Sequence, residues 1–143
     1  MNSPRLASAV AYITALLCFL ALDACWLTVM GPRLYQPALS GLMAPEVDWI
    51  AAALFYLMYI GGLLVFAITP GRQARSPSIA LKYGAAFGLV AYATYDLTNQ
   101  ATLRDWPWTV TLADLAWGAF ASSVAAAAAT RLTSPRASRT ALR

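Results

Sequence analysis

The sequence predicts an all-α integral membrane protein, a bundle of four transmembrane helices. The chain of 143 residues is 60% hydrophobic and only 11% charged, about half the charged fraction of an ordinary soluble domain. Four apolar runs are each long enough to cross the roughly 30 Å hydrocarbon core as a helix. Short segments with Gly, Pro and Arg separate these runs. We therefore expect one transmembrane domain over residues 1–130.

The first span is expected over residues 6–30. Arg5 precedes this apolar run, so a cleaved signal peptide is an alternative, and the residues before Cys25 faintly resemble a lipoprotein cleavage site. The run continues beyond Cys25 for five more residues, which favours a retained helix. Gly31-Pro32-Arg33 is expected to break it, because Gly and Pro interrupt helices.

Three further apolar runs predict the remaining spans, at residues 47–69, 78–98 and 109–130. Asp48 is expected to cap the second span, since Asp is favoured at helix starts, and Pro70-Gly71 is expected to end it. The glycines of the third span, Gly84 and Gly88, are expected to allow close helix packing. The tail, residues 131–143, is basic, contains Ser and Pro, and is expected to be disordered.

Lys and Arg are distributed unevenly between the two sides of the membrane. Eight lie with the N-terminus, the second loop and the C-terminal tail, whereas the other side carries only Arg33 and Arg104. Cytoplasmic loops carry such an excess, so both termini are expected in the cytoplasm and the bilayer is the expected partner. Basic residues placed this way argue against nucleic acid. Four aromatic residues are expected at the outer interface: Tyr35, Trp49, Trp106 and Trp108.

Cofactors and metals are not expected. The sequence has no His, which removes the commonest metal ligand and catalytic base. Neither a zinc motif, a phosphate-binding loop nor a nucleophile motif is present.

Three carboxylates lie inside the predicted spans, near their outer ends. Asp23 is about 10 Å and Asp114 about 7 Å from the outer end of its span at 1.5 Å per residue, and Asp96 is two residues from the end of the third span. A carboxylate facing lipid costs several kcal/mol. These side chains are therefore expected to face the bundle interior or water.

Aromatic and amide side chains accompany these acids. Tyr92, Tyr95 and Asn99 share a helix face with Asp96 in the motif Y-A-T-Y-D-L-T-N. Trp26 and Trp117 each follow an acid by three residues, in two copies of the pattern D-x-x-W. An indole N–H placed one turn from an acid can donate to the carboxylate of a neighbouring helix.

Three functions fit these residues, and the sequence does not choose among them. Clustered carboxylates repel, so one is expected to hold a proton or the site to hold a cation. The first function is binding or transport of a cation or polar small molecule by an outward-facing pocket of acids and aromatics; transport through four short spans would favour a homodimer. The second is a structural or accessory subunit whose acids only fix helix packing. The third, ranked last, is an enzyme acting on a lipid head group with paired Asp as acid and base.

Taken together, these motifs resemble a bacterial family of inner-membrane proteins, domain of unknown function 2177. The resemblance rests on four stretches: residues 22–27, 55–61, 84–99 and 114–118. It implies a compact four-helix protein of the bacterial inner membrane and supplies no activity.

Overall fold

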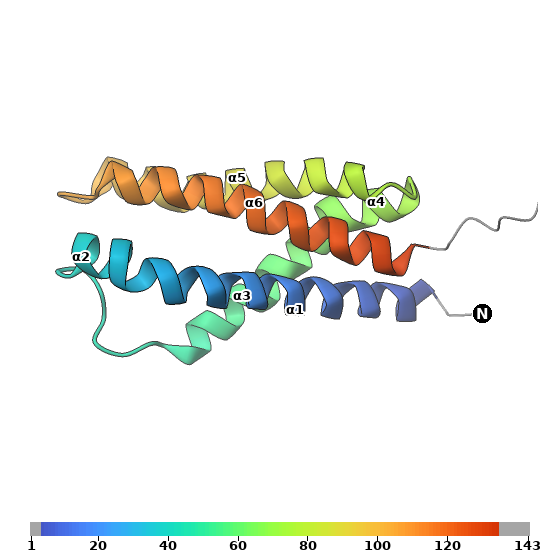
Figure 1. The fold of residues 1–143 in the computed structure, drawn as a ribbon, viewed down its shortest axis with the longest axis horizontal. Helices are drawn as coiled ribbons and strands as arrows, with labels where there is room; N and C mark the ends of the chain where they lie inside the picture. Colours follow the sequence, from blue (N-terminus) through green and yellow to red (C-terminus); the bar gives the residue numbers. More distant parts are fainter. Residues whose placement is uncertain (1–3, 135–143) are drawn as a thin grey trace, which may run out of the picture.

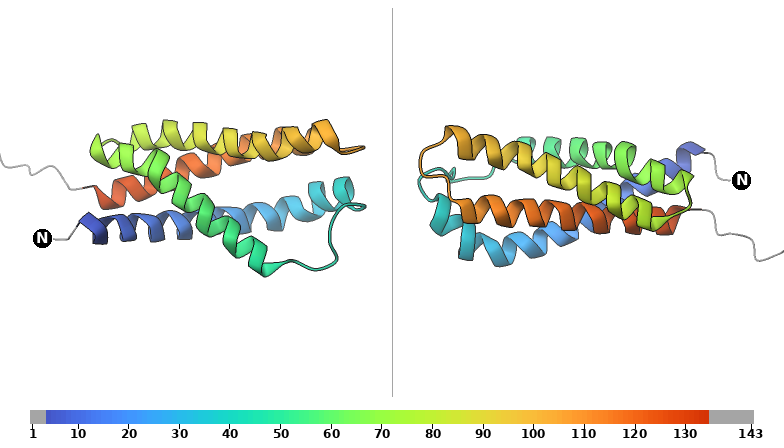
Figure 2. Two further views of the ribbon diagram at one scale, coloured as in Figure 1. Left: turned by 180° about the vertical axis from the view of Figure 1, so that it is seen from behind. Right: turned by 90° about the horizontal axis from the view of Figure 1, so that it is seen from above.

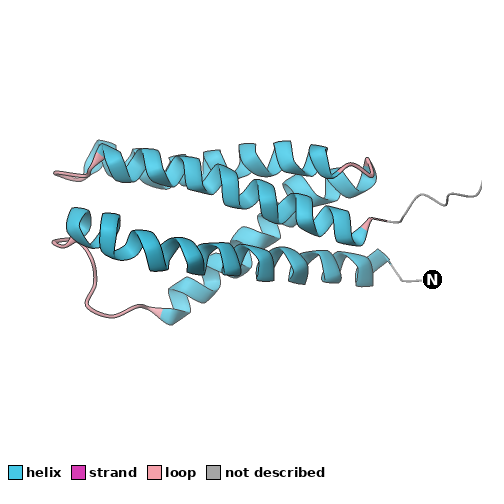
Figure 3. Ribbon diagram, in the orientation of Figure 1, coloured by secondary structure: helices cyan, strands magenta, loops and turns pink. Residues whose placement is uncertain are grey.

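The computed structural model describes residues 4–134, which form four helical rods and contain no strand (Figure 1, Figure 3). This confirms the predicted all-helical bundle. The rods are α1 (Pro4–Met30) continued by η1 (Gly31–Tyr35) and α2 (Gln36–Leu39); α3 (Trp49–Leu63) continued by η2 (Leu64–Ile68) and α4 (Thr69–Gln73); α5 (Pro77–Thr102); and α6 (Trp108–Thr133). Length and composition allow three of them to cross a membrane: Arg5–Leu39, Trp49–Gln73 and Trp108–Thr133. The fourth, α5, has 26 residues and carries more Tyr, Thr and Asn.

Helix α6 lies at the centre of the bundle. It packs along α5 on one side and against α1 on the other, and the start of α1 lies at the same end as the end of α6 (Figure 1). The rod of α3, η2 and α4 crosses the others obliquely (Figure 2). Its second half packs on α5, whereas the first half of α3 diverges from the bundle and leaves most of its side chains exposed. An opening between α3 and α5 follows from this divergence.

The predicted helix breaks at Gly31-Pro32 and Pro70-Gly71 are wrong, because both rods continue through their prolines. A π-helical turn accompanies each proline, and in both turns a backbone N–H donates to the carbonyl five residues earlier. A proline ring clashes with the preceding turn of a regular α-helix, and a wider turn relieves that clash. The first rod therefore reaches Leu39 rather than residue 30.

Glycines on α5 allow very close contact with α6, as the sequence predicted. A Cβ atom added at Gly88 would lie 2.0 Å from the carbonyl oxygen of Gly118. One added at Gly84 would lie 2.7 Å from the carbonyl oxygen of Ser122. Small residues at such crossings let two backbones approach in a membrane, where van der Waals packing drives helix association.

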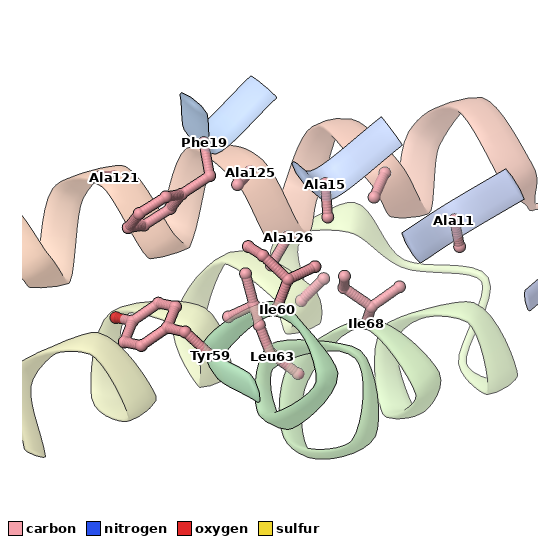
Figure 4. Packing of buried hydrophobic residues seen from close by; sticks show 13 residues of the cluster. Ala11, Ala15, Phe19, Tyr59, Ile60, Leu63, Ile68, Ala121, Ala125 and Ala126 are labelled. Carbon is pink, nitrogen blue, oxygen red and sulfur yellow. The ribbon is translucent and has the colours of Figure 1, made fainter. Parts of the chain in front are cut away.

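The apolar core is built mainly from alanines and a few large side chains (Figure 4). Phe19 of α1, Ile60 and Leu63 of α3, and Ile68 of η2 are fully buried. They face an alanine stripe on α6: Ala121, Ala125, Ala126 and Ala129. Small side chains on α6 let three rods meet around it, and the buried acids lie beyond Phe19, toward the end of the bundle away from the N-terminus.

Two connectors are fixed by side-chain hydrogen bonds. Between α5 and α6, the Trp106 indole N–H donates to Thr111 Oγ1 at 3.1 Å, and the Gln100 amide donates to the Trp106 carbonyl at 2.9 Å. Trp106 is thus buried within the bundle. Helix α6 continues to Thr133, three residues beyond the predicted span; the rest of the predicted tail, 135–143, lies outside the described residues.

Asp48 caps α3 as predicted, accepting hydrogen bonds from the backbone N–H groups of Ile50 and Ala51 at 3.0 Å. Asp48→Ala is expected to lower stability by about 1 kcal/mol, measured as a lower midpoint of thermal unfolding in detergent. Glu46→Ala is the matched control, since it removes an exposed acid of the same loop. Equal midpoints for the two variants would contradict the capping role.

Candidate functional site

Three helices bring the buried acids to one end of the bundle, away from the N-terminus. Asp23 on α1 and Asp114 on α6 are each 7% exposed, and Asp96 on α5 is fully buried. The sequence left open whether the three acids converge. The structure places them at the same end of the bundle, on α1 and α5, which both pack against α6, and on α6 itself.

The two D-x-x-W motifs meet where α1 and α6 pack together in opposite directions. The Trp117 indole N–H donates to Asp23 Oδ1 at 3.3 Å. The Trp26 indole N–H donates at 2.8 Å to the Tyr35 hydroxyl, which donates to Asp114 Oδ1. The two indoles stack at 4.4 Å between centroids, 9° from parallel. Trp117 of α6 therefore hydrogen-bonds directly to the acid of α1, and Trp26 of α1 is linked to the acid of α6 through Tyr35.

Asp23 has donors on both of its oxygens. Trp117 binds Oδ1, and the Tyr56 hydroxyl of α3 donates to Oδ2 at 2.5 Å. A buried carboxylate with both oxygens hydrogen-bonded is stabilised in place. Asp23 thereby links α1, α3 and α6, which is a structural task.

Asp114 differs from Asp23 because only one of its oxygens is engaged. Oδ1 accepts from Tyr35, whereas Oδ2 accepts no hydrogen bond from residues 4–134. All protein donors to Asp23 and Asp114 within this range are tyrosines and tryptophans. Asp114 thus has no cationic partner in the described part of the chain.

Asp114 also lines a cleft of about 430 Å³ between α3, α5 and α6. Its other lining residues are Phe55, Tyr59, Ala91, Tyr92 and Tyr95. Tyr59 is held by a 2.7 Å hydrogen bond between its hydroxyl and Ser122 Oγ, and Tyr92 meets its ring edge to face at 6.2 Å. The volume is that of a small-molecule pocket, and Asp114 is the one ionisable acid among the residues that line it.

Asp96 lies outside this cleft, buried between α5 and α6 with neither carboxyl oxygen hydrogen-bonded within the described residues. Burying an unpaired negative charge at this position would cost far more free energy than burying the neutral carboxyl group. We therefore expect Asp96 to hold its proton.

The predicted site residues divide into three groups. Asp114, Tyr92 and Tyr95 line the cleft; Asp23, Trp26 and Trp117 form the adjoining hydrogen-bonded network; Asp96 is buried apart from both. Asn99 lies one turn beyond Asp96, and its side chain makes no hydrogen bond within residues 4–134.

Sequence reasoning missed three tyrosines of this region. Tyr35 bridges Trp26 and Asp114; a helix assumed to end at Gly31 gave no basis for predicting this bridge. Tyr56 donates to Asp23, and Tyr59 lines the cleft. Their spacing of three residues on α3 was the available signal, since it places both on one helix face.

In the described part of the chain, no group of three or more His, Cys, Asp or Glu side chains lies close enough to hold a metal ion.

Comparison with known proteins yields a family and no relative of assigned activity. Searches of the curated proteins and of the solved structures gave no match. The family model described as "Predicted membrane protein (DUF2177)" matches residues 8–131, which include every residue of the cleft and network and all but the ends of the first and last rods. The chain therefore belongs to the DUF2177 family of predicted membrane proteins.

Proposed function

We propose that this protein binds a small organic cation in the cleft beside Asp114. The observation that carries the proposal is a buried carboxylate, without a cationic partner in the described residues, that lines a cleft together with four aromatic rings. Aromatic faces attract cations, by about 0.5–2 kcal/mol per contact. A carboxylate in the same cleft adds a direct charge attraction, which a low-dielectric surrounding strengthens.

A quaternary or tertiary ammonium group suits this cleft better than an inorganic cation. Small inorganic cations require several oxygen ligands. The lining has one carboxylate and three tyrosine hydroxyls, and the hydroxyl of Tyr59 is already hydrogen-bonded to Ser122. An alkylammonium group requires little more than apolar contact, aromatic faces and a counter-charge.

We further propose that this end of the bundle faces outward from the bacterial inner membrane, with both termini in the cytoplasm. The support is the placement of eight of the ten Lys and Arg residues on the side of the termini. Movement of the bound cation across the membrane would call for a second copy of the chain, because four helices give a cleft at one end and a closed apolar core at the other.

Calorimetric titration of the protein in lipid nanodiscs tests the binding proposal. Choline is the probe, and its neutral isostere with carbon in place of nitrogen is the ligand control. We expect choline to bind at least tenfold more tightly than the isostere, and Asp114→Asn to remove this difference. Tenfold corresponds to about 1.4 kcal/mol, within the range of a cation–π contact plus a charge.

Asp105→Asn is the matched protein control. It removes the same charge from the loop between α5 and α6 at the same end of the bundle, and Asn tolerates the positive φ of 57° at this position. We expect it to leave choline binding unchanged. Equal affinity for choline and its isostere, or equal losses in the two Asn variants, would reject the proposal.

Both oxygens of Asp23 accept hydrogen bonds from protein side chains, which favours a role for this acid in fixing helix packing. This argument applies to Asp23 alone.

A further inference from the structure

A second hollow runs along the same face of α5 as the cleft. This groove, of about 570 Å³, lies between η2 and α5. It is lined by Phe66, Tyr83, Ala86, Phe87, Val90 and Ala91. Ala91 also lines the cleft, so the two hollows adjoin each other at that residue.

The two hollows differ in chemistry. The groove is lined by apolar and aromatic side chains. Phe66 and Phe87 stack at 6.1 Å between centroids, 21° from parallel. Phe87 also lies against Gly62, where an added Cβ would be 2.8 Å from the ring. The cleft holds the carboxylate of Asp114. We call the groove and the cleft together the seam. It has an acid at one end and apolar side chains at the other, so it matches an amphiphile rather than a compact solute.

The seam opens sideways, toward the surface that faces lipid. Phe66, Tyr83 and Val90 in the groove, and Tyr95 in the cleft, are each more than half exposed. Phe66 belongs to a rod that is long and apolar enough to cross a membrane, and α5 packs along α6, another such rod. In a four-helix membrane bundle these exposed faces would contact acyl chains. A ligand can therefore enter from the bilayer without passing through water.

The length of the seam is that of one acyl chain. From Tyr83 to Tyr95 along α5 is twelve residues, or about 18 Å at 1.5 Å per residue. Half of the roughly 30 Å hydrocarbon core is about 15 Å. The groove alone, from Tyr83 to Ala91, covers eight residues, or about 12 Å. A chain lying in it would therefore extend through most of one leaflet while its head group reached Asp114.

We infer that the ligand is a membrane amphiphile with a cationic head group, whose ammonium lies beside Asp114 and whose alkyl chain lies in the groove. This inference rests on the proposed function, since it keeps the same cation site and adds the chain. An alkyl chain that moves from lipid into the groove gains little hydrophobic free energy, because both surroundings are apolar. The groove therefore determines where the chain lies more than how tightly the amphiphile binds. The test must therefore report where the chain lies.

Photolabelling in nanodiscs supplies that report. The probe is an alkyltrimethylammonium with a photoreactive diazirine at the end of a long chain, and labelled peptides are identified by mass spectrometry. We expect labels to concentrate on residues 64–68 and 83–90 rather than spread over all lipid-facing helices. Ala86→Trp, which fills the groove from an exposed position, is expected to reduce this labelling at least fivefold and to leave choline titration unchanged.

Ala21→Trp is the matched control, because it adds the same side chain at an exposed position of α1 that lines neither hollow. It is expected to change neither labelling nor choline binding. Asp114→Asn is expected to reduce both. Labels spread evenly and unaffected by Ala86→Trp, with choline binding still dependent on Asp114, would overturn the amphiphile and leave the cation site. Loss of Asp114 dependence in both measurements would overturn the cation site itself.

Discussion

Gly88→Ala is expected to destabilise the bundle by roughly 3 kcal/mol, at the upper end of the cost of overpacking. The added methyl carbon would lie 2.0 Å from the carbonyl oxygen of Gly118 and 2.5 Å from Ser122 Oγ. Backbone atoms cannot rotate away as a flexible side chain can, so α5 and α6 would have to separate. Separation would also move Asp114 relative to Tyr92, so we expect the variant to lose choline binding together with stability.

Gly61→Ala is the matched control for this substitution. A Cβ at Gly61 meets nothing within 4 Å, and alanine favours a helix over glycine by about 1 kcal/mol. Thermal unfolding in detergent should therefore give a lower midpoint for Gly88→Ala and an equal or higher one for Gly61→Ala. A small effect of Gly88→Ala, comparable to that of Gly61→Ala, would show that the two helices are not in direct contact there.

Asp96→Leu is expected to stabilise the protein, by about 2 kcal/mol. The Asp96 carboxyl is fully buried, and neither of its oxygens has a hydrogen-bond partner within residues 4–134. An unsatisfied buried polar group costs about 1–3 kcal/mol, and an apolar group of similar shape removes that cost. Denaturant unfolding would show a higher midpoint than that of the parent.

Asp23→Leu is the contrasting substitution, with an expected loss of roughly 3 kcal/mol. It leaves the Tyr56 hydroxyl and the Trp117 indole N–H without their acceptor, and each orphaned donor costs about 1–3 kcal/mol. The same chemical change is thus expected to have opposite signs at two buried acids. Two losses of similar size would mean that Asp96 has a partner that stabilises it.

Infrared spectroscopy gives an independent reading of Asp96. The parent should show the carbonyl stretch of a protonated carboxyl group, and Asp96→Leu should lack that band. A parent spectrum without the band would contradict the neutral state expected for a buried, unpaired carboxyl group.

The membrane fold and the burial of the three acids were predictable from the sequence, because a charge within an apolar run is costly unless it is buried in the bundle or exposed to water. The pairing of Trp117 with a neighbouring acid was also foreseen, since D-x-x-W places both groups on one helix face. What the sequence concealed was the length of the first rod. Local rules say that Pro32 ends a helix, but a π turn carries the helix past it, and only then does Tyr35 reach Asp114.

The cleft itself could not be predicted from the sequence. Its aromatic residues look like ordinary membrane packing, and its shape depends on how far the first half of α3 diverges from α5 and α6. The angle at which α3 crosses α5 depends on contacts along the whole helix, such as the approach of Phe87 to Gly62. No local sequence pattern predicts this angle.

The hydrogen bonds that join the first rod to α6 have a consequence for the synthesis of the protein. Chains emerge N-terminus first, so Asp23 enters the membrane well before Trp117 is made, and the donor of Asp114, Tyr35, waits for an acceptor more than seventy residues downstream. Until then α1 holds a polar group whose exposure to lipid is costly. Completion of α6 closes both hydrogen bonds at once. A nascent chain that stops before α6 therefore carries in its first helix an acid with only one oxygen hydrogen-bonded, the one that accepts from Tyr56 of α3, whereas the finished bundle engages both.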